Sequence, residues 1–340
     1  MKEELDIRKS DHIRLAFESQ VSVSEADSRF FYEPMLAPHP EESATLPVRL
    51  GNKEMQYPIW ISSMTGGTEA AYTINQRLAE VCARYGLGMG LGSCRPLLHS
   101  RSRWADFNLR PVLGPDVPFF ANLGIAQIER ILQKSEWQIV EDLVSSLGAD
   151  GLIIHVNPLQ ELMQPEGDRF GRRPLDVIQE CLNHATFPII VKEVGQGFGP
   201  ASLEALLRLP LLAVDFGSFG GTNFTRLENH RNPDAEGLAP LALVGHSAVE
   251  MMAMLQKIYK KQAFPIQTRN IIVSGGIKNF LDGYFLISQS PLPAIYGQAS
   301  AFLKYAAQDA KALDVFTKSQ IKGLQTAFAF LKPKKLSDYS

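Results

Sequence analysis

The sequence has few cysteines, no excess of either charge and no long apolar run. Cys82, Cys94 and Cys181 are its only cysteines in 340 residues, too few and too scattered for a disulfide framework or a zinc site. We therefore expect a reducing compartment, by default the cytoplasm. Residues 1–6 are charged and lack the apolar core of a signal peptide. No run approaches the roughly 18–20 apolar residues of a membrane span, so no membrane partner is expected.

Charge and composition exclude a second set of functions. The formal net charge is −2 and 21% of the residues are charged, so no basic surplus indicates nucleic acid as a partner. With 45% hydrophobic residues, the chain can bury an ordinary globular core. Its length alone would suggest two domains, but α/β barrels commonly exceed about 250 residues as one unit.

Short apolar runs that end in glycine or small polar residues recur from residue 58 onward and alternate with longer amphipathic segments. This is the pattern of repeated strand–helix units. Eight such units predict one α/β domain, a closed (β/α)8 TIM barrel over residues 56–340, because an open doubly wound sheet needs fewer. Polar, proline-punctuated residues 1–55 are expected to form an amino-terminal arm or cap. The runs lie at 58–62, 86–90, 117–122, 151–154, 188–192, 211–215, 270–273 and 293–296.

Three segments between these runs have expected structures of their own. We expect one helix over about residues 125–147, a longer loop over 229–239 that is rich in Asn, Pro and Asp, and a helix near 241–259. A final helical segment should follow the eighth run.

The fourth run leads directly into a polar cluster that contains His155, Asn157, Gln160 and Glu161. Where a buried strand ends at the carboxyl edge of an α/β sheet, its last side chains face the crevice in which ligands bind. These four residue types supply proton-transfer groups, hydrogen-bond donors and an oxygen ligand for a hard cation. The alternative is a strand end whose polar groups merely cap the next helix.

Glycines follow the seventh and eighth runs, at 274–276 (Ser-Gly-Gly) and 297–299 (Gly-Gln-Ala). Such barrels usually bind a phosphate there, because glycine lets backbone amides face an anion. Tight turns without a ligand are the alternative. Thr222 follows a third glycine loop and Met64 lies in a fourth. Together the four loops would surround a large site that suits a flat cofactor with a phosphate tail, such as FMN. Lys192 would lie near the ring or phosphate, or would pair with a carboxylate.

Seven motifs read together closely resemble the type 2 isopentenyl diphosphate isomerases, from about residue 8 to residue 305. The arm, the His-x-Asn-x-x-Gln-Glu motif and Lys-Glu-Val-Gly are specific in combination, whereas glycine loops recur in several FMN barrels. The motifs are Arg-Lys-Ser-Asp-His at 8–12, Ser-Met-Thr-Gly-Gly at 63–67, Ala-Asn-Leu-Gly at 121–124, His-Val-Asn-Pro-Leu-Gln-Glu at 155–161, Pro-Glu-Gly-Asp at 165–168, Val-Lys-Glu-Val-Gly at 191–195 and Gly-Gly-Thr-Asn-Phe at 220–224.

The resemblance implies an enzyme that interconverts isopentenyl and dimethylallyl diphosphate in isoprenoid biosynthesis. It also implies reduced FMN, Mg²⁺, NAD(P)H as reductant and a homo-oligomer, either tetramer or octamer. By motif, the residues expected to touch FMN are Met64, Thr65, Gly66, Ser93, Asn122, Lys192, Thr222, Gly275, Gly276, Ala299 and Ser300. Those expected to face the substrate are Arg8, Lys9, Ser93, Arg95, His155, Asn157 and Gln160. Gln160, His155 and Lys192 would be catalytic, and Glu161 would hold the metal.

Two positions depart from the family pattern, and two rival functions stay open. Cys94 stands where glutamine is common and Lys278 where arginine is common, so flavin or substrate affinity could differ. One rival is an FMN-dependent 2-hydroxy acid oxidase or dehydrogenase, which needs a histidine base beside an arginine that the seventh strand end does not offer. The other is a barrel that binds a ligand or partner without catalysis; Lys192, Gln160 and Glu161 argue against it.

Overall fold

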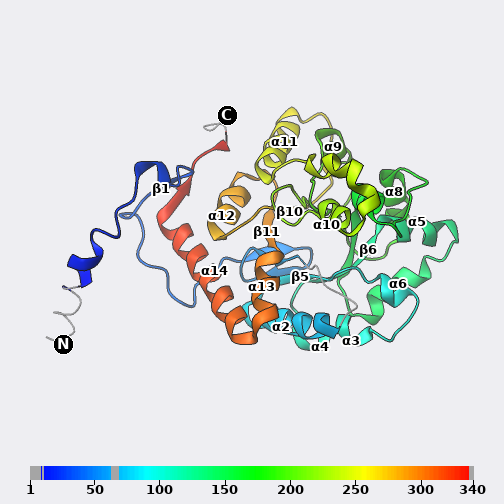
Figure 1. The fold of residues 1–340 in the computed structure, drawn as a ribbon, viewed down its shortest axis with the longest axis horizontal. Coiled ribbons are helices and arrows are strands. Elements are labelled where there is room, and N and C mark those ends of the chain that lie inside the picture. The colour runs from blue at the N-terminus through cyan, green and yellow to red at the C-terminus, as the bar shows by residue number, and fades with distance from the viewer. Residues whose placement is uncertain (1–8, 10, 63–68, 337–340) are drawn as a thin grey trace.

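A closed barrel of eight parallel strands forms the centre of the protein (Figure 1). The computed structural model describes residues 9, 11–62 and 69–336. The strands follow one another in chain order, and the last pairs with the first, so the predicted (β/α)8 fold is confirmed. Each predicted apolar run overlaps one strand. The strands are β4 (Ile59–Ile61), β5 (Gly88–Gly90), β6 (Phe119–Gly124), β7 (Gly151–Val156), β8 (Ile189–Glu193), β9 (Ala213–Asp215), β10 (Asn270–Ser274) and β11 (Ala294–Gln298).

Helices surround the barrel and bury its outer face (Figure 1). Among the described residues, no helix is both long and apolar enough to cross a membrane. The helical segments are η1 (Val23–Glu25), α2 (Glu69–Tyr85), η2 (Arg95–Leu98), α3 (Trp104–Phe107), α4 (Arg110–Leu113), α5 (Ile125–Gln133), α6 (Gln138–Ser146), α7 (Pro158–Met163), α8 (Pro174–His184), α9 (Pro200–Leu207), α10 (Phe224–Arg231), η3 (Pro233–Leu243), α11 (Ala248–Lys261), α12 (Phe280–Gln289), α13 (Ser300–Gln308) and α14 (Ala310–Phe330).

Two of the three predicted segments between the strands were wrong, and the third begins later than predicted. The helix expected over 125–147 is two helices, α5 and α6, because Ser135 adopts a left-handed φ of 57° that a helix cannot continue through. The loop expected over 229–239 is largely helical, formed by the end of α10 and by η3. The helix expected near 241–259 begins only at Ala248, where Ser247 and Glu250 form a capping box.

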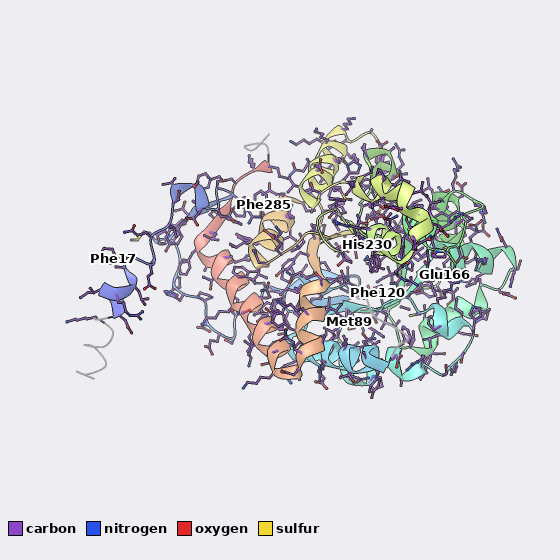
Figure 2. The ribbon with its side chains drawn as sticks, in the orientation of Figure 1. Phe17, Met89, Phe120, Glu166, His230 and Phe285 are labelled. Carbon is purple, nitrogen blue, oxygen red and sulfur yellow. The ribbon has the colours of Figure 1, made fainter. Side chains whose placement is uncertain are left out.

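The amino-terminal end of the barrel is closed by a hairpin of β2 (Val48–Leu50) and β3 (Lys53–Met55). Leu50 and Met55 are buried against inward-facing side chains of the strands. Phe120, labelled in Figure 2, is one of them. Residues 48–55 therefore contribute to the barrel's own core, while the division of the chain at residue 55 stays a prediction. The other inward residues of this cluster are Trp60, Ile153, Ile190, Leu212, Ala213, Ile272 and Ile295.

Two segments from opposite ends of the sequence pair beside the barrel. Strand β1 (Phe30–Tyr32) pairs antiparallel with β12 (Leu331–Pro333), which directly follows α14. Arg29 strengthens this junction through an ion pair of 2.8 Å with Asp282 of α12. Residues 11–28 extend away from the barrel, and Phe17 lies exposed far out on this arm (Figure 2).

We expect Leu50→Ala to lower the free energy of unfolding by about 2–5 kcal/mol, because it empties space in a sealed core. Leu50 is 2% exposed. The matched control is Leu243→Ala, at a leucine that is 69% exposed, which should change stability by less than about 0.5 kcal/mol. Urea unfolding followed by circular dichroism measures both. Equal effects of the two substitutions would contradict the role given to the hairpin.

Candidate active site

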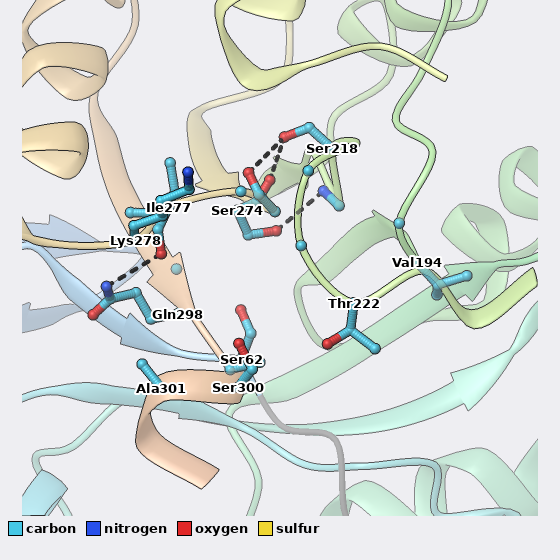
Figure 3. Close-up of a pocket in the computed structure, with 18 of the residues that line it drawn as sticks. Ser62, Val194, Ser218, Thr222, Ser274, Ile277, Lys278, Gln298, Ser300 and Ala301 are labelled. Carbon is cyan, nitrogen blue, oxygen red and sulfur yellow. Dashed lines mark hydrogen bonds between the residues drawn. The ribbon is translucent and has the colours of Figure 1, made fainter. Parts of the chain in front are cut away.

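A cavity of about 430 Å³ opens at the carboxyl ends of the strands. The loops after β8, β9, β10 and β11 supply nearly all of its walls, and Figure 3 shows their side chains converging on one space. This is the barrel face at which parallel strands present their last residues. The lining residues that the sequence predicted are Lys192, Thr222, Gly275, Gly276, Ala299 and Ser300.

The wall after β10 requires glycine. Gly275 has a φ of +85°, and a Cβ atom there would lie 2.1 Å from the backbone oxygen of Ser218, a distance no side chain can occupy. Gly276 follows with a φ of +74°. The loop after β10 can therefore pack against Ser218 in the loop after β9 only because Gly275 has no side chain. The backbone amide groups of Gly275 and Gly276 can then face the cavity.

The features of an anion site gather on this side of the cavity. Helix α13 begins here, after Ala299, and the first amides of a helix have no partner within the helix. Lys278 and Lys304 also line the cavity and bring two positive charges to it. Backbone amides, a helix start and two lysines suit a phosphate group.

Lys192 occupies the middle of a row across three strands. Its register neighbours are His155 on β7 and Asp215 on β9. The ammonium donates to the backbone oxygen of Glu193 at 2.9 Å. In the described part of the chain it forms no ion pair with Glu193 or Asp215, so the salt bridge considered as an alternative from the sequence does not form. Its positive charge is left available to the cavity.

Asp215, at one end of this row, is fully buried. Burial raises the pKa of its carboxyl group, and the charge of Lys192 opposes that rise. The Ser274 hydroxyl donates to Asp215 and accepts the Gly217 N–H at 3.1 Å. Figure 3 shows Ser274 at the cavity wall. The network joins the ends of β9 and β10 and so holds the two glycine loops together.

Glu193 stabilises the neighbouring loop in a different way. One carboxylate oxygen accepts the backbone N–H groups of Gly195, Gln196 and Gly197 at 2.6–2.9 Å. Burial raises the pKa of this carboxyl group, and the three N–H groups oppose that rise. These hydrogen bonds fix the loop after β8, in which Gly195 lines the cavity.

His155 is held in one tautomer. Its Nδ1 lies 2.8 Å from Oδ1 of Asn122, whose own Nδ2 donates to the Leu91 oxygen at 2.8 Å. Because the amide oxygen can only accept, Nδ1 carries the proton and Nε2 is an acceptor. Burial, with the charge of Lys192 second, lowers the histidine pKa to about 3. His155 is therefore neutral at physiological pH.

Asn157, Gln160 and Glu161 come together at the start of α7. The Asn157 amide donates to Gln160 at 3.1 Å and to Oε1 of Glu161 at 3.0 Å. The other oxygen of Glu161 accepts the backbone N–H of Asp168 at 2.7 Å. Glu161 is 5% exposed and forms no ion pair within the described residues. It is thus a buried carboxylate that lacks a cationic partner.

Arg95 and Ser93 lie beside this group. The Ser93 hydroxyl accepts the Arg95 backbone N–H at 3.4 Å, and the guanidinium lies 3.6 Å from Asp168. Cys94, the departure between them, is fully buried, and burial raises the pKa of its thiol to about 12. Cys94 therefore acts as an apolar filler behind the loop.

Not every predicted residue can be placed. Arg8, Met64, Thr65 and Gly66 lie outside the described residues, and Lys9 is exposed on the arm. Conversely, Ser62, Ser218 and Lys304 line the cavity but were missed, whereas Gln298 belongs to the predicted phosphate loop at 297–299. Lys304 could have been found, because it lies four residues after Ser300 on the same face of a helix.

The donor set for a metal is small. Among the described residues, no three His, Cys, Asp or Glu side chains gather in a way that could hold an ion. A metal at Glu161 would take its other ligands from water and from a bound anion, as Mg²⁺ usually does.

Solved structures define the class of fold. The chain matches a flavocytochrome b2 variant with sulfite bound at a TM-score of 0.62 and 12% identity, covering 91% of this chain and 74% of that one. It matches a mandelate oxidase mutant with an FMN adduct at a TM-score of 0.53 and 11% identity, covering 90% and 88%. The protein thus has the barrel fold of the flavin-binding domain of flavocytochrome b2.

The family follows from curated relatives. An isopentenyl-diphosphate delta-isomerase of Rickettsia africae is 36% identical over 309 residues, 89% of this chain and 86% of that protein. The Rickettsia prowazekii protein of the same name is 34% identical over 312 residues, 90% and 87%. No family model matches. The chain belongs to the isopentenyl-diphosphate delta-isomerase family, which confirms the resemblance seen in its motifs.

We expect His155 to stay neutral, with its proton on Nδ1, down to about pH 4. Because the pKa in the folded protein lies below the ordinary value of 6.5, the unfolded chain binds more protons between these values. Stability should fall as the pH drops from 6.5 toward 3, and His155→Gln should reduce that fall. ¹⁵N shifts of labelled histidine report the charge. A resonance of His155 that titrates near pH 6.5 would contradict this assignment.

Proposed function

We propose that the protein is an FMN- and Mg²⁺-dependent isomerase that interconverts isopentenyl and dimethylallyl diphosphate. The observation that carries the proposal is the identity of 34–36% to isomerases of that name along almost the whole chain. The cavity at the carboxyl ends of the strands, with glycine loops, a helix start and two lysines suited to a phosphate, supports it independently.

FMN fits the cavity by its chemistry. The glycine loop of Gly275 and Gly276 and the start of α13 would hold its phosphate, with Lys278 and Lys304 as counter-charges. The Ser62 hydroxyl and Oε1 of Gln298 are buried and have no partner in the described part of the chain, so both could accept hydrogen bonds from a polar ring. When bound, the reduced flavin supplies an electron-rich ring able to exchange a proton with the substrate. Ser93, Asn122 and Thr222 would complete the contacts, with Met64, Thr65 and Gly66.

Glu161 would hold Mg²⁺. The carboxylate is buried without a cation, and Oδ1 of the adjacent Asn157 is also buried without a partner in the described chain. Oxygen donors of this kind suit a hard cation whose remaining ligands are diphosphate oxygens and water. The metal would neutralise the diphosphate and fix its position.

The protein's own groups would divide the remaining work. Arg95 would bind the diphosphate, and Arg8 and Lys9 would close over it from the arm and exclude water. His155, being neutral, offers an acceptor at Nε2 and no charge. Gln160 would use its amide N–H groups, which donate to no described residue, to orient the substrate, since its oxygen already accepts from Asn157. Lys192 would place positive charge beside the flavin.

We also propose that NAD(P)H reduces the flavin and that the protein is cytoplasmic. We propose that it forms a homo-oligomer, either a tetramer or an octamer. Phe17, Val21, Val23 and Met35 are 79–93% exposed and support association of the arm with another copy. The segment Ser274–Lys278 holds neither histidine nor arginine, so nothing beyond the fold favours a 2-hydroxy acid oxidase.

We expect the purified protein to bind FMN in preference to FAD, since the cavity has one place for a terminal phosphate. With FMN, Mg²⁺ and a reductant it should convert isopentenyl diphosphate to dimethylallyl diphosphate. Flavin absorbance, mass spectrometry and product chromatography test this. A protein that refuses flavin at saturation, or that carries reduced FMN and forms no product, would overturn the proposed function.

Glu161→Gln should raise the Mg²⁺ concentration for half-maximal activity at least tenfold, because it removes an anionic ligand at almost constant volume. The matched control is Glu166→Gln, since Glu166 lies five residues on, is exposed and pairs with Arg231 at 3.4 Å. This variant should keep the parent's Mg²⁺ dependence. Titration of activity with Mg²⁺ gives both values, and an unaltered response in Glu161→Gln would place the metal elsewhere.

A further inference from the structure

Asp168 is a buried carboxylate on which three side chains converge. It is 8% exposed and accepts hydrogen bonds from Arg130 and, at 2.9 Å, from Gln127. The Arg95 guanidinium lies 3.6 Å from the same carboxylate. These partners come from α5 and η2, whereas Asp168 follows α7, so one carboxylate ties together three segments around the site.

The backbone around Asp168 also makes close contacts with Glu161. Its N–H donates to Oε2 of Glu161 at 2.7 Å, and Arg169 donates to the Glu161 backbone oxygen at 2.8 Å. A Cβ atom on Gly167 would lie 1.9 Å from that same oxygen. The segment 167–169 is therefore packed directly on Glu161 and cannot shift without moving it.

Charge decides what this arrangement is suited to bind. Arg95 and Arg130 both pair with the Asp168 carboxylate. Two positive charges therefore face one negative charge at this point. Arg95 is 42% exposed along its side chain, so it keeps donors for a ligand. Within the described residues, the Glu161 carboxylate forms no ion pair. A metal-bound diphosphate has the complementary pattern, with a cation for Glu161 and phosphate oxygens for Arg95.

We propose that Asp168 is a positioning residue that sets the distance between Glu161 and Arg95 for a magnesium diphosphate. Its backbone holds Glu161 and its carboxylate holds Arg95, so one residue fixes both ends of the binding site. The inference rests on the proposed function for the identity of the substrate, and it adds a role for a residue that does not itself touch the ligand.

A purely structural role for Asp168 predicts something different. Removing one partner of a buried ion pair destabilises a protein wherever the pair lies. Asp150 offers a matched control, because its carboxylate also accepts a backbone N–H, from Phe119 at 2.8 Å, and pairs with Arg110 at 2.9 Å and Lys53 at 2.6 Å. It directly precedes β7 and so lies at the opposite end of the barrel from the site.

The experiment compares FMN-loaded parent, Asp168→Asn and Asp150→Asn. For Asp168→Asn we expect the KM for isopentenyl diphosphate to rise at least tenfold, with kcat within threefold and flavin content unchanged. Calorimetric titration with inorganic pyrophosphate and Mg²⁺ should show a similar loss of affinity, which gives a readout apart from activity. Asp150→Asn should lose stability yet keep the parent's KM and pyrophosphate affinity.

The outcomes separate the inference from the function on which it rests. A parent without isomerase activity, but with pyrophosphate binding that depends on Asp168, would overturn the proposed function and support the positioning role. Parental KM and affinity in Asp168→Asn, or equal losses in Asp150→Asn, would overturn the positioning role. Should Asp168→Asn not fold, Arg130→Gln replaces it, since Arg130 is half-exposed. That variant should raise KM at least threefold, and an unchanged KM would overturn the inference.

Discussion

The pairing of β11 with β4 closes the sheet of eight parallel strands, so none of them has an unpaired edge. Because all eight strands are parallel, their carboxyl ends lie together at one rim of the barrel. The row of His155, Lys192 and Asp215 exists because β7, β8 and β9 are in register at that rim.

Burying carboxylates at that rim is costly unless each has partners. Glu193 has three backbone N–H groups, and Asp168 has Gln127 and two arginines. Asp215 has the Ser274 hydroxyl and the field of Lys192. The Glu161 carboxylate accepts hydrogen bonds from neutral N–H donors and forms no ion pair among the described residues. It therefore has room in its electrostatic surroundings for a bound cation.

The sequence predicted the barrel because buried parallel strands are nearly continuous apolar runs, and the glycine loops because backbone contact excludes side chains. It could not reveal what depends on distant contacts. The turn at Ser135 interrupts an apolar periodicity that continues on both sides of it. The pairing of β1 with β12 joins residues about 300 positions apart. Asp168 was visible as part of a motif, but its partners on α5 and η2 became apparent only in three dimensions.

The lowered pKa of His155 changes how charge is distributed around the site. A histidine beside a proposed diphosphate site would ordinarily be counted as a cation, but burial and Lys192 keep this one neutral. Positive charge for an anionic substrate would then come from arginines, lysines and the proposed metal, while His155 contributes an acceptor fixed by Asn122. Separating charge neutralisation from hydrogen bonding in this way lets the two ends of a small substrate be held by different groups. In the proposed function, Arg95 and a cation at Glu161 would hold the polar end of the substrate, apart from the neutral His155.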